Sequence, residues 1–366
     1  MEKGKISSLQ MAFMMYPTIV ATAILGVPSI TAKYAETDLW LSPILAALIG
    51  YLTVYIAIKL HKLYPKQTVI QFSEQIIGLI PGKILGFLFL FFYIQTTGLI
   101  LRAYGEFVVD SFLFKTPISV IMALMVLLCA FIVRGGIEVL GRAAQLFVPV
   151  FIFPIFILIL LLIPDIEFKN IFPILGNGIM PPIKGAIVPG GWFSEFFLMI
   201  FLLPFLADKK KGMKHGMMTV FAVMMTLIVV NLMVLFVLGS TTSTKFYPLM
   251  NASRYISVTA FFEHVESAVM AVWIVGTFVK ISVFYYASAI GSAQWLNLSD
   301  YRPVVWPIGI LIVIFSFWSL PSSMDVSRND INVFPLQGIL IQTIIPLLLL
   351  VIAVIRTRNR KGVDSS

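Results

Sequence analysis

Long apolar runs alternate with short polar connections along almost the whole chain. A helix that crosses the bilayer's hydrocarbon core of about 30 Å needs roughly 20 apolar residues, and ten runs approach or reach that length. The pattern therefore predicts ten membrane-spanning helices, at Leu9–Ile30, Leu39–Leu60, Ile84–Val109, Pro117–Val133, Ala143–Ile163, Pro181–Phe205, His215–Gly239, Phe262–Ala289, Val304–Trp318 and Phe334–Ile355.

Two of these runs contain residues that disturb a helix, at positions 21–28 of the first run and 189–191 of the sixth. Backbone groups freed from a helix find no water in lipid, so such breaks survive only where they line a cavity inside the protein. Paired interruptions in corresponding halves of a chain point to the binding site of a transporter. These two lie 168 residues apart, close to half the chain, and we expect both helices to break there.

The composition places the chain among polytopic membrane proteins. It is 59% hydrophobic and only 12% charged, with a mean hydropathy of +0.98. The first apolar run is too long for a cleavable signal. Cys129 is the only cysteine, which excludes disulfide frameworks and cysteine metal sites, and the three histidines are widely separated. We therefore expect no metal and no cofactor.

The net charge of +9 is distributed as a topology signal and does not indicate a nucleic-acid partner. With the N-terminus inside, seventeen Lys and Arg residues fall in cytoplasmic segments and seven in external ones. The positive-inside rule then predicts that both termini are cytoplasmic, as an even number of spans requires. Residues 356–366 form a short cytoplasmic tail, and residues 1–366 form a single membrane domain. The connection between Lys62 and Lys83 predicts an amphipathic surface helix around Ser73.

The first interruption contains Ala21, Thr22, Ala23 and Gly26. Ala21 lies about 12 residues into its span, or roughly 18 Å at 1.5 Å per residue, which is near the midplane. Small residues let the backbone approach a ligand, and amide donors exposed at a half-helix N-terminus suit a carboxylate. The alternative is a proline kink packed with small residues.

The second interruption is Pro189, Gly190 and Gly191. Proline removes a backbone donor and the two glycines free the chain, so carbonyls left at the half-helix end could accept from an ammonium group. The alternative is a turn at the end of a helix. Taken together, the two interruptions favour a ligand site.

Glu195 and Lys280 are ionisable side chains within predicted spans. Such residues are expensive in a bilayer and are functional candidates by default. Glu195 could carry a proton or meet an amine, and Lys280 could exchange protons or replace a bound sodium ion. The alternatives are a structural ion pair for Glu195 and a lysine that reaches back to the inner interface for Lys280.

Polar residues also gather in the third predicted span, at Tyr93, Gln95, Thr96 and Thr97, and in the eighth, at Tyr285 and Tyr286. They either face a ligand or form hydrogen bonds between helices. Farther along the third span, Arg102, Glu106 and Asp110 share one helix face and can form ion pairs. This face either gates an external vestibule or holds helices together. Motifs for phosphate binding, metal ligation or a catalytic triad are missing, so an enzyme is not expected.

Residues 21–28 are similar to the G-T-G-x-L-x-x-P element of amino-acid permeases, with alanine at both glycine positions. Other stretches narrow the resemblance to the B subunit of GerA-type spore germinant receptors, over essentially the whole chain. They are Ile6-Ser7-Ser8-Leu9-Gln10, Tyr64-Pro65-Lys66-Gln67-Thr68, Arg134-Gly135-Gly136-Ile137-Glu138 with Gly141-Arg142, and Pro173-Ile174-Leu175-Gly176-Asn177-Gly178-Ile179.

This resemblance implies a fold of the amino acid–polyamine–organocation superfamily, with two inverted five-helix repeats at about 9–163 and 181–355. It implies a spore inner-membrane protein that detects a small nutrient such as an amino acid and acts with an A subunit and a lipoprotein C subunit. By carry-over, residues 21–26 and 189–191 would face the ligand, and Glu106 matches an acidic position on a polar path.

Two other functions remain open from the sequence. One is a secondary transporter of amino acids, coupled to protons through Glu195 or Lys280. The other is a structural or channel-like component that passes water or ions during germination. The leading hypothesis is the nutrient-sensing subunit, and the paired interruptions motivate it. Because no signalling domain is visible in the sequence, a partner is needed to pass the signal on.

Overall fold

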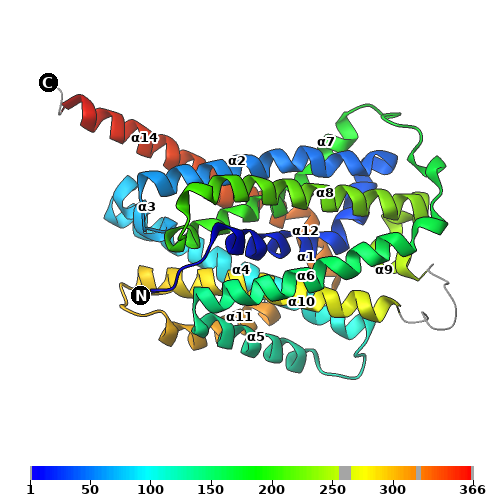
Figure 1. The fold of residues 1–366 in the computed structure, drawn as a ribbon, viewed down its shortest axis with the longest axis horizontal. Helices are drawn as coiled ribbons and strands as arrows, with labels where there is room; N and C mark the ends of the chain where they lie inside the picture. The colour runs from blue at the N-terminus through cyan, green and yellow to red at the C-terminus, as the bar shows by residue number, and fades with distance from the viewer. Residues whose placement is uncertain (1, 255–264, 319–322, 364–366) are drawn as a thin grey trace.

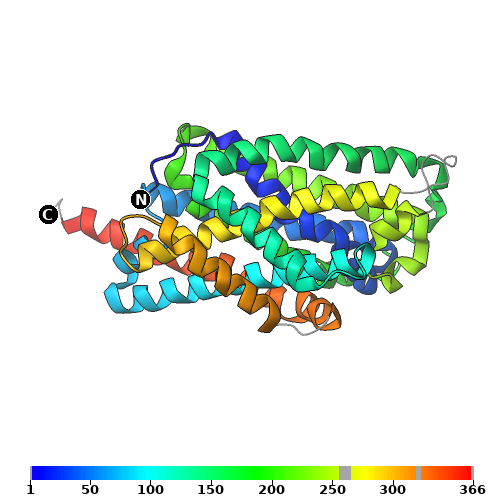
Figure 2. The same cartoon turned by 90° about the horizontal axis from the view of Figure 1, so that it is seen from below.

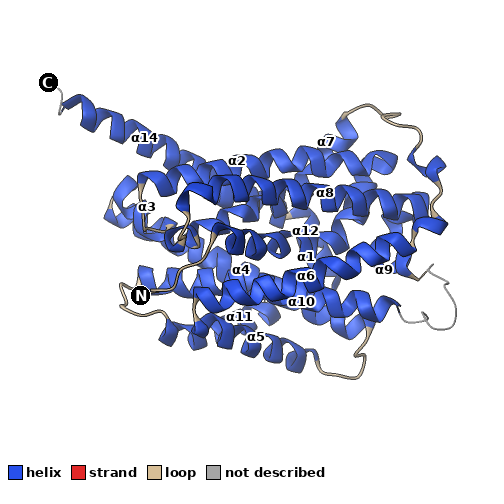
Figure 3. Ribbon diagram, in the orientation of Figure 1, coloured by secondary structure: helices blue, strands red, loops and turns tan. Residues whose placement is uncertain are grey.

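The computed structural model describes residues 2–254, 265–318 and 323–363. Within these ranges every regular element is helical (Figure 3), apart from an isolated bridge between Ile6 and Leu206. The predicted all-α fold class is confirmed.

The helices follow the predicted apolar runs closely. In the first half of the chain they are α1 (Ser8–Ala35), α2 (Ser42–Leu63), α3 (Val69–Ile77), α4 (Leu79–Ser111), α5 (Ile118–Gly135) and α6 (Ile137–Leu161). In the second half they are α7 (Met180–Ser194), α8 (Gly212–Leu238), α9 (Pro248–Ser253), α10 (Val265–Trp295), α11 (Arg302–Trp318), α12 (Ser323–Asn332), α13 (Phe334–Ile339) and α14 (Ile345–Val363). The predicted start of the eighth span at Phe262 lies outside the described residues.

Eight stretches of the described chain are long and apolar enough to cross a membrane. The first of them, Ser8–Leu63, contains both α1 and α2, and the apolar helix α11, with 17 residues, falls just below the length of a full span. The chain is thus a multi-pass helical membrane protein, and the total of ten spans stays a prediction.

The long helices lie side by side along one axis of the molecule (Figure 1). Both chain termini and α3 lie at one end of this bundle, and α9 lies at the other (Figures 1 and 2). Termini at the same end agree with an even number of crossings. The buried side chains of α3 face α4, so the amphipathic helix predicted around Ser73 is confirmed.

Helix α1 is continuous across residues 21–26, so the predicted break in the first span is wrong. Alanine is the best helix former, and alanine at positions 21 and 23 favours an intact helix over an unwound turn. Hydroxyl groups bond backbone carbonyls around Pro28, from Ser29 to Gly26 at 3.1 Å and from Thr31 to Val27 at 2.7 Å. The helix packs against α6, α7, α8 and α10, which makes it central in the bundle.

The predicted break at residues 189–191 is also displaced. Helix α7 runs through Pro189 to Ser194, and the α-helix gives way to a 3₁₀ helix at Glu195–Phe201. The glycines instead permit close packing of helices. A Cβ atom on Gly190 would lie 2.7 Å from Ile49 of α2, and one on Gly191 would lie 2.6 Å from the backbone of Pro335 in α13.

The N-terminal segment ties several helices together at the end that carries the termini. The Ile6 amide donates to the Phe205 carbonyl at 3.0 Å, and the Ala207 amide donates to the Ile6 carbonyl at 2.9 Å. The Ser8 amide and hydroxyl both donate to the Asp208 carboxylate at 2.6 Å. This end of the bundle is therefore closed by the chain's own first residues.

Candidate functional site

A cavity of about 190 Å³ lies in the middle of the bundle, between α1, α4, α7 with its 3₁₀ extension, α10, α12 and α13. Aromatic side chains form much of its wall, namely Phe107, Trp192, Phe246, Tyr247, Trp273 and Phe334. It reaches the surface near Lys33 and Thr244, at the end of the bundle opposite the chain termini. Its volume is below the roughly 300–1,000 Å³ of sites for drug-sized ligands, so it suits a smaller molecule.

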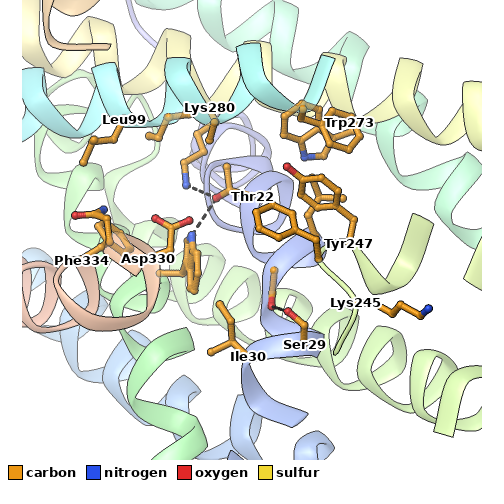
Figure 4. A pocket seen from close by; sticks show the side chains of 18 of the residues that line it. Thr22, Ser29, Ile30, Leu99, Lys245, Tyr247, Trp273, Lys280, Asp330 and Phe334 are labelled. Carbon is orange, nitrogen blue, oxygen red and sulfur yellow. Dashed lines mark hydrogen bonds between the residues drawn. The ribbon is translucent and has the colours of Figure 1, made fainter. Parts of the chain in front are cut away.

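A buried ion pair lies at the inner part of this cavity. The Lys280 ammonium on α10 lies 2.8 and 3.0 Å from the two Glu195 carboxylate oxygens, and both side chains are almost completely buried. The ammonium also donates to the Thr22 hydroxyl on α1 at 2.8 Å (Figure 4). Three elements far apart in the sequence thus meet at one ammonium group.

Helix α1 also fixes the two tryptophans that line the cavity. The Trp192 indole donates to the Thr22 hydroxyl at 3.0 Å, and the Trp273 indole donates to the Ala21 carbonyl. Each indole N–H is therefore satisfied, as a buried tryptophan requires. The aromatic faces are consequently held in place around the cavity by the segment that the sequence singled out.

A second carboxylate enters the cavity from α12. Asp330 lies across from Thr22 and Lys280 (Figure 4), and its neighbour Asn329 lines the cavity beside it. Lys33 and Lys245 line the outer part of the cavity. The site thus has carboxylates at its inner end, amines toward its mouth and aromatic rings between them.

Five of the residues singled out from the sequence line the cavity: Thr22, Gly26, Thr96, Glu195 and Lys280. Ala21 and Ala23 are buried within α1. Pro189, Gly190 and Gly191 are buried too, with the two glycines packed against α2 and α13 and none of the three at the cavity surface. The roles of all these residues in ligand binding stay predictions.

Other predicted site residues lie behind the cavity wall. Tyr93 is fully buried among aromatic rings, and the Thr97 hydroxyl donates to its carbonyl at 2.6 Å. The Tyr285 hydroxyl donates to the Val305 carbonyl, which ties α10 to α11. The contacts of Tyr93 and Tyr285 join different helices, whereas the Thr97 hydrogen bond lies within α4.

Glu106 forms an ion pair with Arg102 one turn earlier in α4, with 2.5 Å between Oε1 and Nη2. The predicted pairing along this helix face is therefore present for these two residues. Neither lies on the cavity surface, although Ala103 and Phe107 of the same helix do. A gating role for Glu106 stays a prediction.

Three residues that line the cavity were not predicted from the sequence, namely Trp192, Trp273 and Asp330. Trp192 directly follows the glycine pair and was detectable as an aromatic residue beside an interruption. Trp273 and Asp330 carried no such signal, because nothing local places residue 273 or the polar stretch around residue 330 beside α1. Only the packing of α10 and α12 brings them there.

Comparisons with known proteins agree with this architecture. A family model described as "Spore germination protein" matches residues 5–323. Spore germination protein KB of Bacillus subtilis (strain 168) is 27% identical over 369 residues, covering 99% of this chain and 98% of that protein. Spore germination protein YndE of the same organism is 26% identical over 372 residues, with 98% and 99% covered.

Solved structures show the same fold at low sequence identity. A Na⁺-coupled sialic acid symporter in a substrate-bound outward-open state matches with a TM-score of 0.69 and 12% identity, over 94% of this chain and 90% of its own. MhsT in complex with L-phenylalanine matches with a TM-score of 0.65 and 14% identity, over 96% and 89%. The chain therefore has the leucine-transporter-like fold that was predicted.

Proposed function

Since the chain belongs to the spore germination protein family, we propose that it is the nutrient-sensing membrane subunit of a spore germinant receptor. A small nutrient such as an amino acid enters the cavity from the outer side and binds between the mouth and the Glu195–Lys280 pair. An A subunit and a lipoprotein C subunit, together with this chain in the spore inner membrane, pass the signal on.

The observation that carries this proposal is the ion pair at the inner end of a small cavity in a transporter fold. Removing two charges from water is costly, and a buried pair is weak evidence for stability. Ionisable residues inside a membrane protein therefore point to function. A ligand that contacts this pair from one side favours whichever arrangement of the helices makes the better contacts, and the partner subunits read that difference.

A germination screen of a deletion strain, nutrient by nutrient, tests the proposal. The strain should lose its response to one nutrient class and regain it with the wild-type gene. The Gly26→Val variant should need at least tenfold more nutrient, because a side chain there enters the cavity and meets no close neighbour. Ala207→Val, at an exposed position, is the matched control.

The measurements are loss of optical density on germination and the amount of protein in spore membranes. Unchanged responses to every nutrient, in a strain that also lacks related receptors, would contradict the sensor. A normal response of the Gly26→Val strain at normal protein abundance would remove the cavity from the proposal and leave the sensor function intact.

A secondary transporter of amino acids coupled to protons is the second candidate, favoured by the fold and by the Glu195–Lys280 pair. Reconstitution in liposomes separates the two functions. Accumulation of a labelled amino acid that is driven by a pH gradient and abolished in Glu195→Gln supports transport. Saturable binding without flux supports the sensor.

A further inference from the structure

The inner end of the cavity contains one more negative charge than positive charge. Glu195 and Asp330 line it as carboxylates, and the Lys280 ammonium, which pairs with Glu195, lies near Asp330 (Figure 4). Among the described residues, no lysine, arginine or histidine forms an ion pair with Asp330. A carboxylate removed from water is costly unless a cation pairs with it.

Lys280 cannot supply that cation in the observed arrangement. Its ammonium has three donors, and its three acceptors are the two Glu195 oxygens and the Thr22 hydroxyl. Asp330 also lies on a helix that contributes no residue to this network, because α12 packs on α4 and α13. Its carboxylate lines the open cavity beside the Asn329 side chain.

The surroundings of that space suit an ammonium group. Trp192 and Phe334 pack against each other in the cavity wall, with ring centroids 5.7 Å apart. Aromatic faces attract cations, and a carboxylate forms strong charge-assisted hydrogen bonds with them. Lys33 and Lys245, nearer the mouth, offer positive charge to an anionic group at the other end of the same ligand.

We propose that Asp330 is the recognition residue for the ligand's ammonium group, which binds inward on its carboxylate while the carboxylate of the amino acid points toward the mouth. This inference rests on the proposed function and adds to it the recognition residue and the orientation of the ligand. The ligand is held by side chains and not by an unwound backbone, because α1 beside the cavity is an intact helix.

The pH dependence of binding follows from the same arrangement. Desolvation by the surrounding protein, partly offset by the Lys280 charge, raises the pKa of Asp330 to about 7, although part of its surface faces the open cavity. Glu195 and Lys280 face it from the 3₁₀ helix Glu195–Phe201 and from α10, and Lys33, Lys245 and Tyr247 lie toward the mouth. An ammonium group binds the ionised carboxylate, so affinity should fall as the pH drops below about 7.

Ligand-induced thermal stabilisation of the purified full-length protein tests this inference. The probes are the proteinogenic L-amino acids, and for each that stabilises the protein, the acid that lacks the amino group, such as propionate for alanine. At least one amino acid should bind, and its deaminated counterpart should bind at least tenfold more weakly. Asp330→Asn should weaken binding at least tenfold and flatten the pH profile, while Asp330→Glu retains part of the affinity.

Asp165→Asn, which removes a carboxylate from an exposed outer connection, is the control and should bind like wild type. Binding of the deaminated acid with equal affinity, wild-type affinity in a folded Asp330→Asn variant, or stabilisation by no amino acid would each overturn the inference. The germinant-sensing function is judged separately by the deletion strain, and it survives these results if the strain still loses a nutrient response.

Discussion

At the scale of single residues, the central feature is the pairing of Glu195 with Lys280 in the interior of the bundle. Both were candidates from sequence because each places an ionisable group within an apolar run. Their partnership was not visible there, since 85 residues separate them. Thr22 completes the network from a third helix. The sequence thus identified the three residues as candidates, and their contact depends on the packing of α1, α10 and the 3₁₀ helix that follows α7.

The pair should show strong energetic coupling. Glu195→Gln or Lys280→Met alone leaves a buried charge without its partner and should lower the unfolding free energy by about 3–5 kcal/mol. The double variant removes both charges and should recover most of that loss. Melting of the protein in detergent, followed by tryptophan fluorescence, measures the three variants. Additive losses in the double variant would refute the coupling.

At the scale of elements, the two interrupted helices differ from the prediction for physical reasons. Small residues and prolines were interpreted as breaks that expose backbone to a ligand. In α1, alanine keeps the helix intact and Thr22 presents a side chain to the site. In α7, glycine lets α2 and α13 approach, and the change to a 3₁₀ helix occurs at Glu195. A sequence pattern cannot separate close packing from close approach of a ligand, because both require small residues.

Two glycine variants distinguish these roles. Gly191→Ala should destabilise the protein by about 1–3 kcal/mol, because its new Cβ atom meets the backbone of α13. Gly26→Ala should leave stability unchanged or raise it slightly, because its Cβ atom has nothing closer than 3.7 Å and alanine favours a helix. Thermal midpoints in detergent compare the two. Equal midpoints would contradict the packing role of Gly191.

At the scale of the whole molecule, the two ends of the bundle differ. The N-terminal segment closes one end through its hydrogen bonds to residues 205–208, and the cavity reaches the surface at the other. Both termini lie at the closed end. The excess of lysine and arginine predicts that this end is cytoplasmic, so the cavity would open to the outside, where a nutrient arrives.

Fusion proteins test this orientation. A fluorescent protein joined after residue 363 should fluoresce, and alkaline phosphatase joined there should be inactive, because it folds only outside the cytoplasm. Alkaline phosphatase inserted after Asp165, between α6 and α7, should be active. The opposite pattern at both sites would reverse the topology and place the cavity mouth inside the cell.

The sequence by itself determined the class of protein, the positions of its helices and its family. An apolar run that is long enough to cross the bilayer identifies a membrane-spanning helix directly, because each residue's contribution to the hydrophobicity of the run is local and additive. It also identified Thr22, Gly26, Glu195 and Lys280, because charge and small size are unusual in such runs. The tertiary structure alone decided which of these share a cavity, that α1 and α7 stay helical at the suspected breaks, and that Asp330 joins the site. Those outcomes depend on contacts between segments that are distant in the chain, which no local pattern records.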